Sequence, residues 1–120
     1  MDPNKLKGNE MKKIIIIATL LTLLATNSYA DCNGGVCSDI KVQNLYAMSN
    51  GTITVETTGN ELNLNCTSSG NGYVTVAPTD PGKNAIYSML LTAQTTQKKV
   101  YIRVVDNSNQ CRINYVFLAE

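Results

Sequence analysis

The sequence has 120 residues, a formal net charge of +1 and only 16% charged residues. A chain of this length suits one domain with a small core, and its near-neutral charge excludes the basic surface that nucleic-acid binding requires. It contains no histidine, which excludes a Ser-His-Asp triad and the commonest general acid–base residue. We therefore expect no enzyme, no cofactor and no nucleic-acid partner.

The N-terminal quarter has the features of an export signal. Residues 1–10 are polar and read as an upstream extension before Met11. Residues 11–30, "MKKIIIIATLLTLLATNSYA", combine two lysines, an apolar run and a small-x-small site, which predicts a signal peptide cleaved after Ala30. The apolar run is short for a membrane span and no stop-transfer pattern follows. We expect a periplasmic or secreted protein without a stable membrane anchor.

Residues 31–120 are then a single domain of 90 residues, in which six basic and seven acidic residues give a net charge of −1. All four cysteines lie in this domain, and an even count in a small exported domain predicts two disulfides. Three connectivities exist. We favour Cys32–Cys37, which closes the turn "CNGGVC", and Cys66–Cys111, which ties the middle of the chain to its last strand. Without histidine or a C-x-x-C spacing, we expect no metal site.

The first half of the domain alternates between apolar and polar residues, as β-strands do. Strands are predicted near 39–47, at 52–57 and at 62–66, the last with Leu62, Leu64 and Cys66 on one face. Asn-Gly within 49–52 is a strong hairpin signal. These segments predict a three-stranded antiparallel meander.

The second half contains one helix between strand-like segments. Residues 73–77 fit either a short strand or an extended connection. A helix is predicted from about Pro81 to Thr95, because its apolar residues form one stripe: Ala85, Ile86, Met89, Leu90 and Ala93. Strands follow at 98–106 and 111–119. In the last strand, the alternation puts Ile113, Tyr115 and Phe117 on one face.

The order of these elements predicts a mainly β (α+β) fold. An α+β sandwich and a small closed barrel both fit the segments. A five-stranded antiparallel OB-like barrel carries its one α-helix between strands three and four, where this helix falls. We therefore expect an OB-like barrel.

The stretch "AIYSMLLTAQTTQKKVYIRV" at 85–104 resembles the helix and following strand of subtilase cytotoxin B subunits and their typhoid-toxin relatives. A weaker likeness runs along "CSDIKVQNLYAMSNGTITV", at 37–55. The resemblance implies an OB-fold pentamer that binds sialylated or related glycans. In those subunits a serine near the start of the first strand helps to hold the sugar, and Ser38 stands at the matching place. Asp39 and Lys41 are near enough to add polar contacts.

Those subunits also use a tyrosine on the strand after the helix. The matching position here is Val104, and Tyr101 stands three residues earlier, so Tyr101 completes the candidate glycan site. Tyrosine rings suit both sugar stacking and protein interfaces. Tyr87 and Tyr101 are the two that we expect to face outward from the corner between helix and strand.

Two functions from different classes follow. The first is an exported, non-enzymatic binding module for a glycan or surface protein, assembled as a homo-oligomeric ring such as a pentamer. The alternative is a periplasmic or secreted structural or inhibitor-type domain that binds proteins and no sugar. In that case Ser38 is an ordinary residue at the start of a strand, beside a disulfide.

Overall fold

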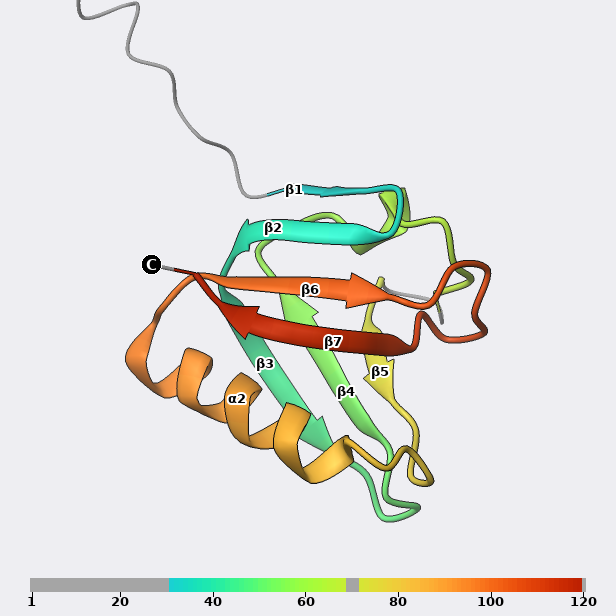
Figure 1. Ribbon diagram of the computed structural model, residues 1–120, viewed down its shortest axis with the longest axis vertical. Coiled ribbons are helices and arrows are strands. Elements are labelled where there is room, and N and C mark those ends of the chain that lie inside the picture. The colour runs from blue at the N-terminus through green and yellow to red at the C-terminus, as the bar shows by residue number, and fades with distance from the viewer. Residues whose placement is uncertain (1–30, 69–71, 120) are drawn as a thin grey trace, which may run out of the picture.

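The computed structural model describes residues 31–68 and 72–119, and the predicted extension and signal peptide lie outside this range. In the described part, two antiparallel sheets and one α-helix enclose a common core (Figure 1). The strands are β1 (Asp31–Asn33), β2 (Val36–Ile40), β3 (Val42–Ala47), β4 (Ile53–Thr57), β5 (Val74–Val76), β6 (Val100–Val104) and β7 (Ile113–Leu118). The helices are the 3-10 helix η1 (Glu61–Asn63) and the α-helix α2 (Lys83–Thr96).

One sheet has the strand order β1-β2-β6-β7, and the other has the order β3-β4-β5. Only Lys41 separates β2 from β3, so the chain passes from one sheet to the other at a single bend. On the far side, an isolated parallel bridge between Thr75 and Arg112 is the contact between β5 and the chain leading into β7. The prediction of a mainly β protein with one α-helix is confirmed. The prediction of a closed five-stranded barrel is wrong, because the structure has seven strands in two sheets that do not close.

The predicted third strand at 62–66 is also wrong. The Asn60 side chain accepts a hydrogen bond from the Leu62 N–H at 3.2 Å, which starts η1 instead of a strand. Glu61 is buried, and its carboxylate accepts hydrogen bonds from the N–H and hydroxyl of Thr57 at 2.7 and 2.6 Å. Leu62 is 63% exposed as a result. The third strand of the meander is β5, within the segment that fitted either a strand or a connection.

The core lies between the two sheets and under α2. Helix α2 packs against β3 and β7 (Figure 1), with Leu90 and Ala93 fully buried. Ile86 and Met89 pack at the edge of the core, as the predicted stripe requires. The helix ends within one residue of the predicted position, and Gln97 caps it in the left-handed conformation.

Both favoured disulfides are present. Cys32–Cys37 joins directly opposite residues of β1 and β2, and Cys66–Cys111 joins positions 45 residues apart. In the part of the chain that the structure describes, no helix is long and apolar enough to span a membrane.

Candidate functional site

Three of the four predicted site residues meet at a β-bulge. The register between β2 and β6 shifts between Cys37 and Ile40. Ser38 and Asp39 therefore lie together opposite the single residue Tyr101. A bulge bends its strand and re-aims the side chains it carries. Asp39 adopts φ 53°, a left-handed conformation that aspartate tolerates better than most residues. Both bulge side chains are exposed on the outer face of the four-stranded sheet.

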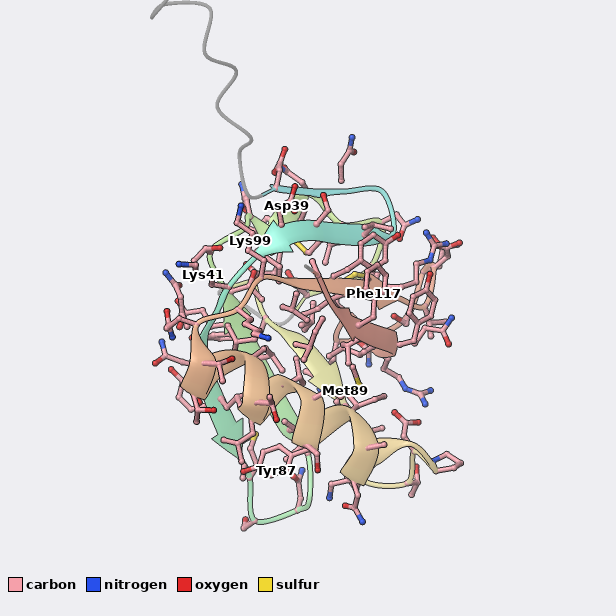
Figure 2. All side chains as sticks on the ribbon, turned by 60° about the vertical axis from the view of Figure 1, so that its left-hand side comes forward. Asp39, Lys41, Tyr87, Met89, Lys99 and Phe117 are labelled. Carbon is pink, nitrogen blue, oxygen red and sulfur yellow. A yellow bond between two sulfur atoms is a disulfide. The ribbon has the colours of Figure 1, made fainter. Side chains whose placement is uncertain are left out.

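Lys41, the fourth predicted residue, lies at the bend between β2 and β3. Its backbone is held by Thr58, whose hydroxyl accepts from the Lys41 N–H at 3.0 Å, and its side chain is exposed. Ile40 pairs with Val100 and the two strands are antiparallel, so Lys99, just before Val100, lies level with Lys41, just after Ile40. Figure 2 shows Asp39, Lys99 and Lys41 along one edge of the molecule. Within the described residues neither lysine forms an ion pair, so both charges are open to a ligand.

An exposed aromatic cluster lies beside the bulge. It consists of Tyr101 on β6 with Tyr115 and Phe117 on β7. The Tyr101 ring stacks on Phe117 at 4.5 Å between centroids and on Tyr115 at 6.2 Å, with interplanar angles of 18° and 13°. Tyr115 and Phe117 are each 46% exposed, so much of their ring surface faces solvent. The stacking covers the ring faces between Tyr101 and Phe117, so the aromatic surface left open to an apolar group belongs mainly to Tyr115 and Phe117.

Tyr115 and Phe117 were not predicted as site residues. The alternation rule puts Ile113 on their face, but the register of β6 and β7 shifts between Arg103 and Val104. This shift leaves Asn114 without a partner, so Ile113 turns into the core while both aromatic residues turn outward. The signal was present as two aromatic residues two positions apart in a strand, but the bulge that reverses their face has no sequence signature. Tyr87, which we expected outside, packs against the core.

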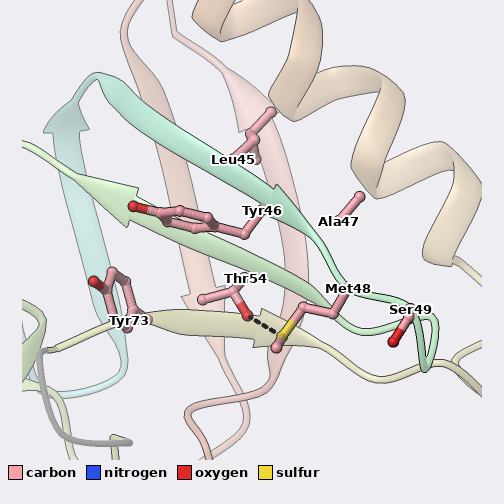
Figure 3. Close-up of a pocket in the computed structure, with 7 residues that line it drawn as sticks. All are labelled: Leu45, Tyr46, Ala47, Met48, Ser49, Thr54 and Tyr73. Atoms are coloured by element: carbon pink, nitrogen blue, oxygen red, sulfur yellow. Dashed lines mark hydrogen bonds between the residues drawn. The ribbon is translucent and has the colours of Figure 1, made fainter.

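A groove lies on the other sheet, over β3 and β4 (Figure 3). It has a volume of about 680 Å³ and is lined by Leu45, Tyr46, Ala47, Met48, Ser49, Thr54 and Tyr73. The rings of Tyr46 and Tyr73 meet edge to face, with centroids 5.9 Å apart and planes at 75°. Desolvation raises the pKa of the Tyr46 hydroxyl above its ordinary value, and the neighbouring Tyr73 and Glu56 raise it further. Sequence reasoning identified both tyrosines only as amphipathic rings.

Within residues 31–68 and 72–119, no three His, Cys, Asp or Glu side chains gather as a metal site. All four cysteines of the described range are paired in disulfides, so this range contains no free thiol. Comparisons of the chain with protein-family models, curated proteins and solved structures find no match. The two surfaces themselves therefore carry the functional inference.

Proposed function

We propose that this protein is an exported, non-enzymatic binding module that holds a glycan against the outer face of the four-stranded sheet. The observation that carries this proposal is the aromatic cluster beside the bulge of Ser38 and Asp39. A sugar ring has apolar C–H faces that pack on aromatic rings, and hydroxyls that need donors and acceptors at the side. The Ser38 hydroxyl and the Asp39 carboxylate supply both, about one strand spacing from Tyr101.

The exposed lysines at 41 and 99 support an acidic sugar as the ligand. An ammonium group attracts a carboxylate such as that of sialic acid, which is the ligand class implied by the resemblance to toxin B subunits. Exposed charge pairs contribute little free energy each, typically below about 1 kcal/mol. The lysines therefore favour acidic over neutral glycans, while the aromatic cluster supplies most of the affinity.

Assembly into a ring is part of this proposal. The aromatic face is flat, and a flat site holds one sugar weakly. Several copies on one ring engage several sugars at once and raise the overall affinity by avidity. An open OB-like arrangement suits such a ring. Two features support the OB-like arrangement: β2 and β3 run as one bent strand, and α2 lies in sequence between β5 and β6.

A protein partner is the second candidate for the same face. Exposed tyrosine and phenylalanine side chains are enriched at protein interfaces, and Tyr115 and Phe117 form a flat aromatic patch. A structural or inhibitor-type domain would bury this patch against its target, with Ser38 at the rim. The two candidates differ in what Ser38 does, because a rim hydroxyl contributes little to a protein interface.

The test is a glycan array with the exported protein, followed by titration of any glycan that binds. We expect acidic glycans to bind, and Phe117→Ala to weaken binding about tenfold through loss of one stacking ring. Ser38→Ala should weaken it several-fold. Leu91→Ala is the matched control, because Leu91 is an exposed apolar residue on α2. Absence of any glycan signal, or binding unchanged by both site variants, excludes the glycan proposal.

Export is tested separately. The mass of the protein recovered from the periplasm and from the medium should correspond to a chain that begins at Asp31. A full-length mass in the cytoplasm alone would contradict the predicted signal peptide and the export part of the proposal. Light scattering of the same sample then gives the number of copies in the assembly. A monomer would contradict the part of the proposal that concerns the ring.

A further inference from the structure

We propose that the groove between Tyr46 and Tyr73 is a second binding site, and that it takes a small organic cation with an alkylated ammonium head group. The groove lies on the three-stranded sheet, whereas the aromatic cluster and the bulge lie on the four-stranded sheet. The two sites share no residue. This inference therefore does not depend on the glycan proposal.

The groove has the walls that an ammonium head group requires. Tyr46 and Tyr73 stand nearly perpendicular, so their rings form a corner. Met48, which is 53% exposed, adds a polarizable thioether to the same groove, next to Thr54 and further along the sheet than the two rings (Figure 3). The faces of aromatic rings attract cations, and such cages recognise quaternary ammonium groups. The volume of about 680 Å³ lies within the range of small-molecule sites.

The charge around the groove favours a cation over an anion. In the β3–β4 register, Tyr46 pairs with Thr54 and Asn44 pairs with Glu56. Residues two apart in a strand share a face, so the Glu56 carboxylate lies on the same outer face as the Tyr46 ring. The Asn44 amide donates to this carboxylate at 2.7 Å and holds it in place. The seven lining residues include no lysine or arginine, and the Glu56 carboxylate is close enough to act on the Tyr46 hydroxyl through its charge.

The protonation of Tyr46 agrees with this picture. The pKa of the Tyr46 hydroxyl is raised above its ordinary value of 10.0 by desolvation first, and the negative charge of Glu56 adds to the rise. A cation bound in the corner would stabilise the phenolate and lower that pKa. A neutral apolar ligand would increase desolvation and raise it. The direction of the change therefore distinguishes the two kinds of ligand.

The remaining side chains fix how deep the ligand sits. The Thr54 hydroxyl contacts the Met48 sulfur at 3.7 Å, which holds the thioether against the sheet. Ser49 stands at the turn beyond Met48 and offers a hydroxyl at the rim. A choline-like molecule matches the corner through its trimethylammonium group, whereas Ser49 lies about 10 Å further along the strand and is out of reach of its hydroxyl. An extended peptide would leave the corner empty unless it carried a methylated lysine.

The experiment compares choline with its uncharged isostere 3,3-dimethylbutan-1-ol by calorimetric titration of the whole exported protein, in the same salt. We expect choline to bind about tenfold more tightly than the isostere. Equal binding would overturn the assignment of a cation and leave only an apolar groove. No saturable binding of choline up to about 50 mM would overturn the site itself.

Two variants test the residues. Glu56→Gln keeps the hydrogen-bonding shape and should weaken choline binding several-fold without affecting the isostere. Tyr73→Leu should abolish the preference for choline, with circular dichroism verifying that the sheet is intact. Phe117→Ala is the control, because it removes a ring from the other sheet and should leave choline binding unchanged. If Glu56→Gln and Tyr73→Leu bind choline as the unchanged protein does, the site is wrongly assigned. Absorbance titration should also show choline lowering the pKa of Tyr46.

Discussion

Removing the Cys66–Cys111 disulfide should cost about twice as much stability as removing Cys32–Cys37. The first pair closes a loop of 45 residues and the second a loop of five. On the chain-entropy model, the longer loop contributes about 4 kcal/mol and the shorter about 2 kcal/mol, through the unfolded state. A domain of this size has a total stability of only about 5 to 10 kcal/mol. The double variant Cys66→Ala/Cys111→Ala should therefore be only marginally folded.

The folded state keeps most of its contacts when the longer bridge is removed. Backbone hydrogen bonds join Asn65 to Gly34 at 2.7 Å, Asn107 to Asn65 at 3.0 Å and Thr67 to Ser108 at 3.0 Å. The last two of these bonds hold the two ends of the loop together without the sulfur atoms. Packing losses do not favour the longer pair either, because Cys32 and Cys37 are both fully buried, whereas Cys66 is only partly buried. Any excess cost of the longer pair thus belongs to loop closure.

The assay is urea unfolding of the two double variants, followed by far-ultraviolet circular dichroism. With an m-value of about 1 kcal/mol per M, the two midpoints should differ by about 2 M, with Cys66→Ala/Cys111→Ala the lower. The protein in reducing agent is the control and should be less stable than either. Coincident midpoints, or a lower midpoint for Cys32→Ala/Cys37→Ala, would refute the loop-entropy reasoning for this protein.

Three further outcomes are expected. Gln97→Gly should stabilise the protein by about 0.5 to 1 kcal/mol and so raise its thermal midpoint, because Gln97 caps α2 at φ 55°, where glycine is unstrained. A lower midpoint would mean that the hydrogen bond from the Gln97 side chain contributes more than the strain costs. Glu61→Ala should cost about 1 to 3 kcal/mol in urea unfolding, and Thr57→Val less, because the Thr57 variant loses only one of the two bonds to the Glu61 Oε1 atom. The raised pKa of Tyr46 favours its protonated form in the folded state, so this stabilisation is complete below the ordinary value of 10.0 and is lost as the pH rises through the folded value. Urea midpoints between about pH 9 and 11 should fall less for Tyr46→Phe than for the unchanged protein, and an equal fall would contradict this.

Local chemistry fixed what could be predicted from the sequence. The α2 stripe, the Asn50-Gly51 hairpin and the strand alternation at 52–57 all depend on neighbouring residues. The structure has the hairpin and the alternation, and it has the stripe except for Ala85, which is exposed. The bridge Cys32–Cys37 was favoured among three connectivities because the turn "CNGGVC" can bend to bring its two cysteines together. The 62–66 segment failed for the opposite reason. Its alternation of leucines fits a strand, but the buried carboxylate of Glu61 makes two hydrogen bonds that a strand there would break.

The candidate site was predicted in part, and the missing part depends on register. Ser38, Asp39 and Tyr101 come together only because the bulge in β2 sets two residues against one. A second register shift turns Phe117 outward. A one-residue slip moves every side chain to the opposite face of a strand, so register shifts decide which aromatic residues are exposed. Such shifts arise from long-range pairing, which a window of sequence does not contain.

Both proposed sites depend on the open arrangement of the two sheets. Because the sheets do not close into a barrel, each keeps an outer face of its own, and the bend at Lys41 directs them differently. The face of the four-stranded sheet has exposed lysines beside stacked rings, which suits an acidic sugar. The face of the three-stranded sheet has the Glu56 carboxylate beside perpendicular rings, which suits a cation. A sugar bearing a carboxylate and a choline-type head group should therefore bind without competing. Phe117→Ala should weaken only the binding of the sugar, and Tyr73→Leu should remove only the preference for choline.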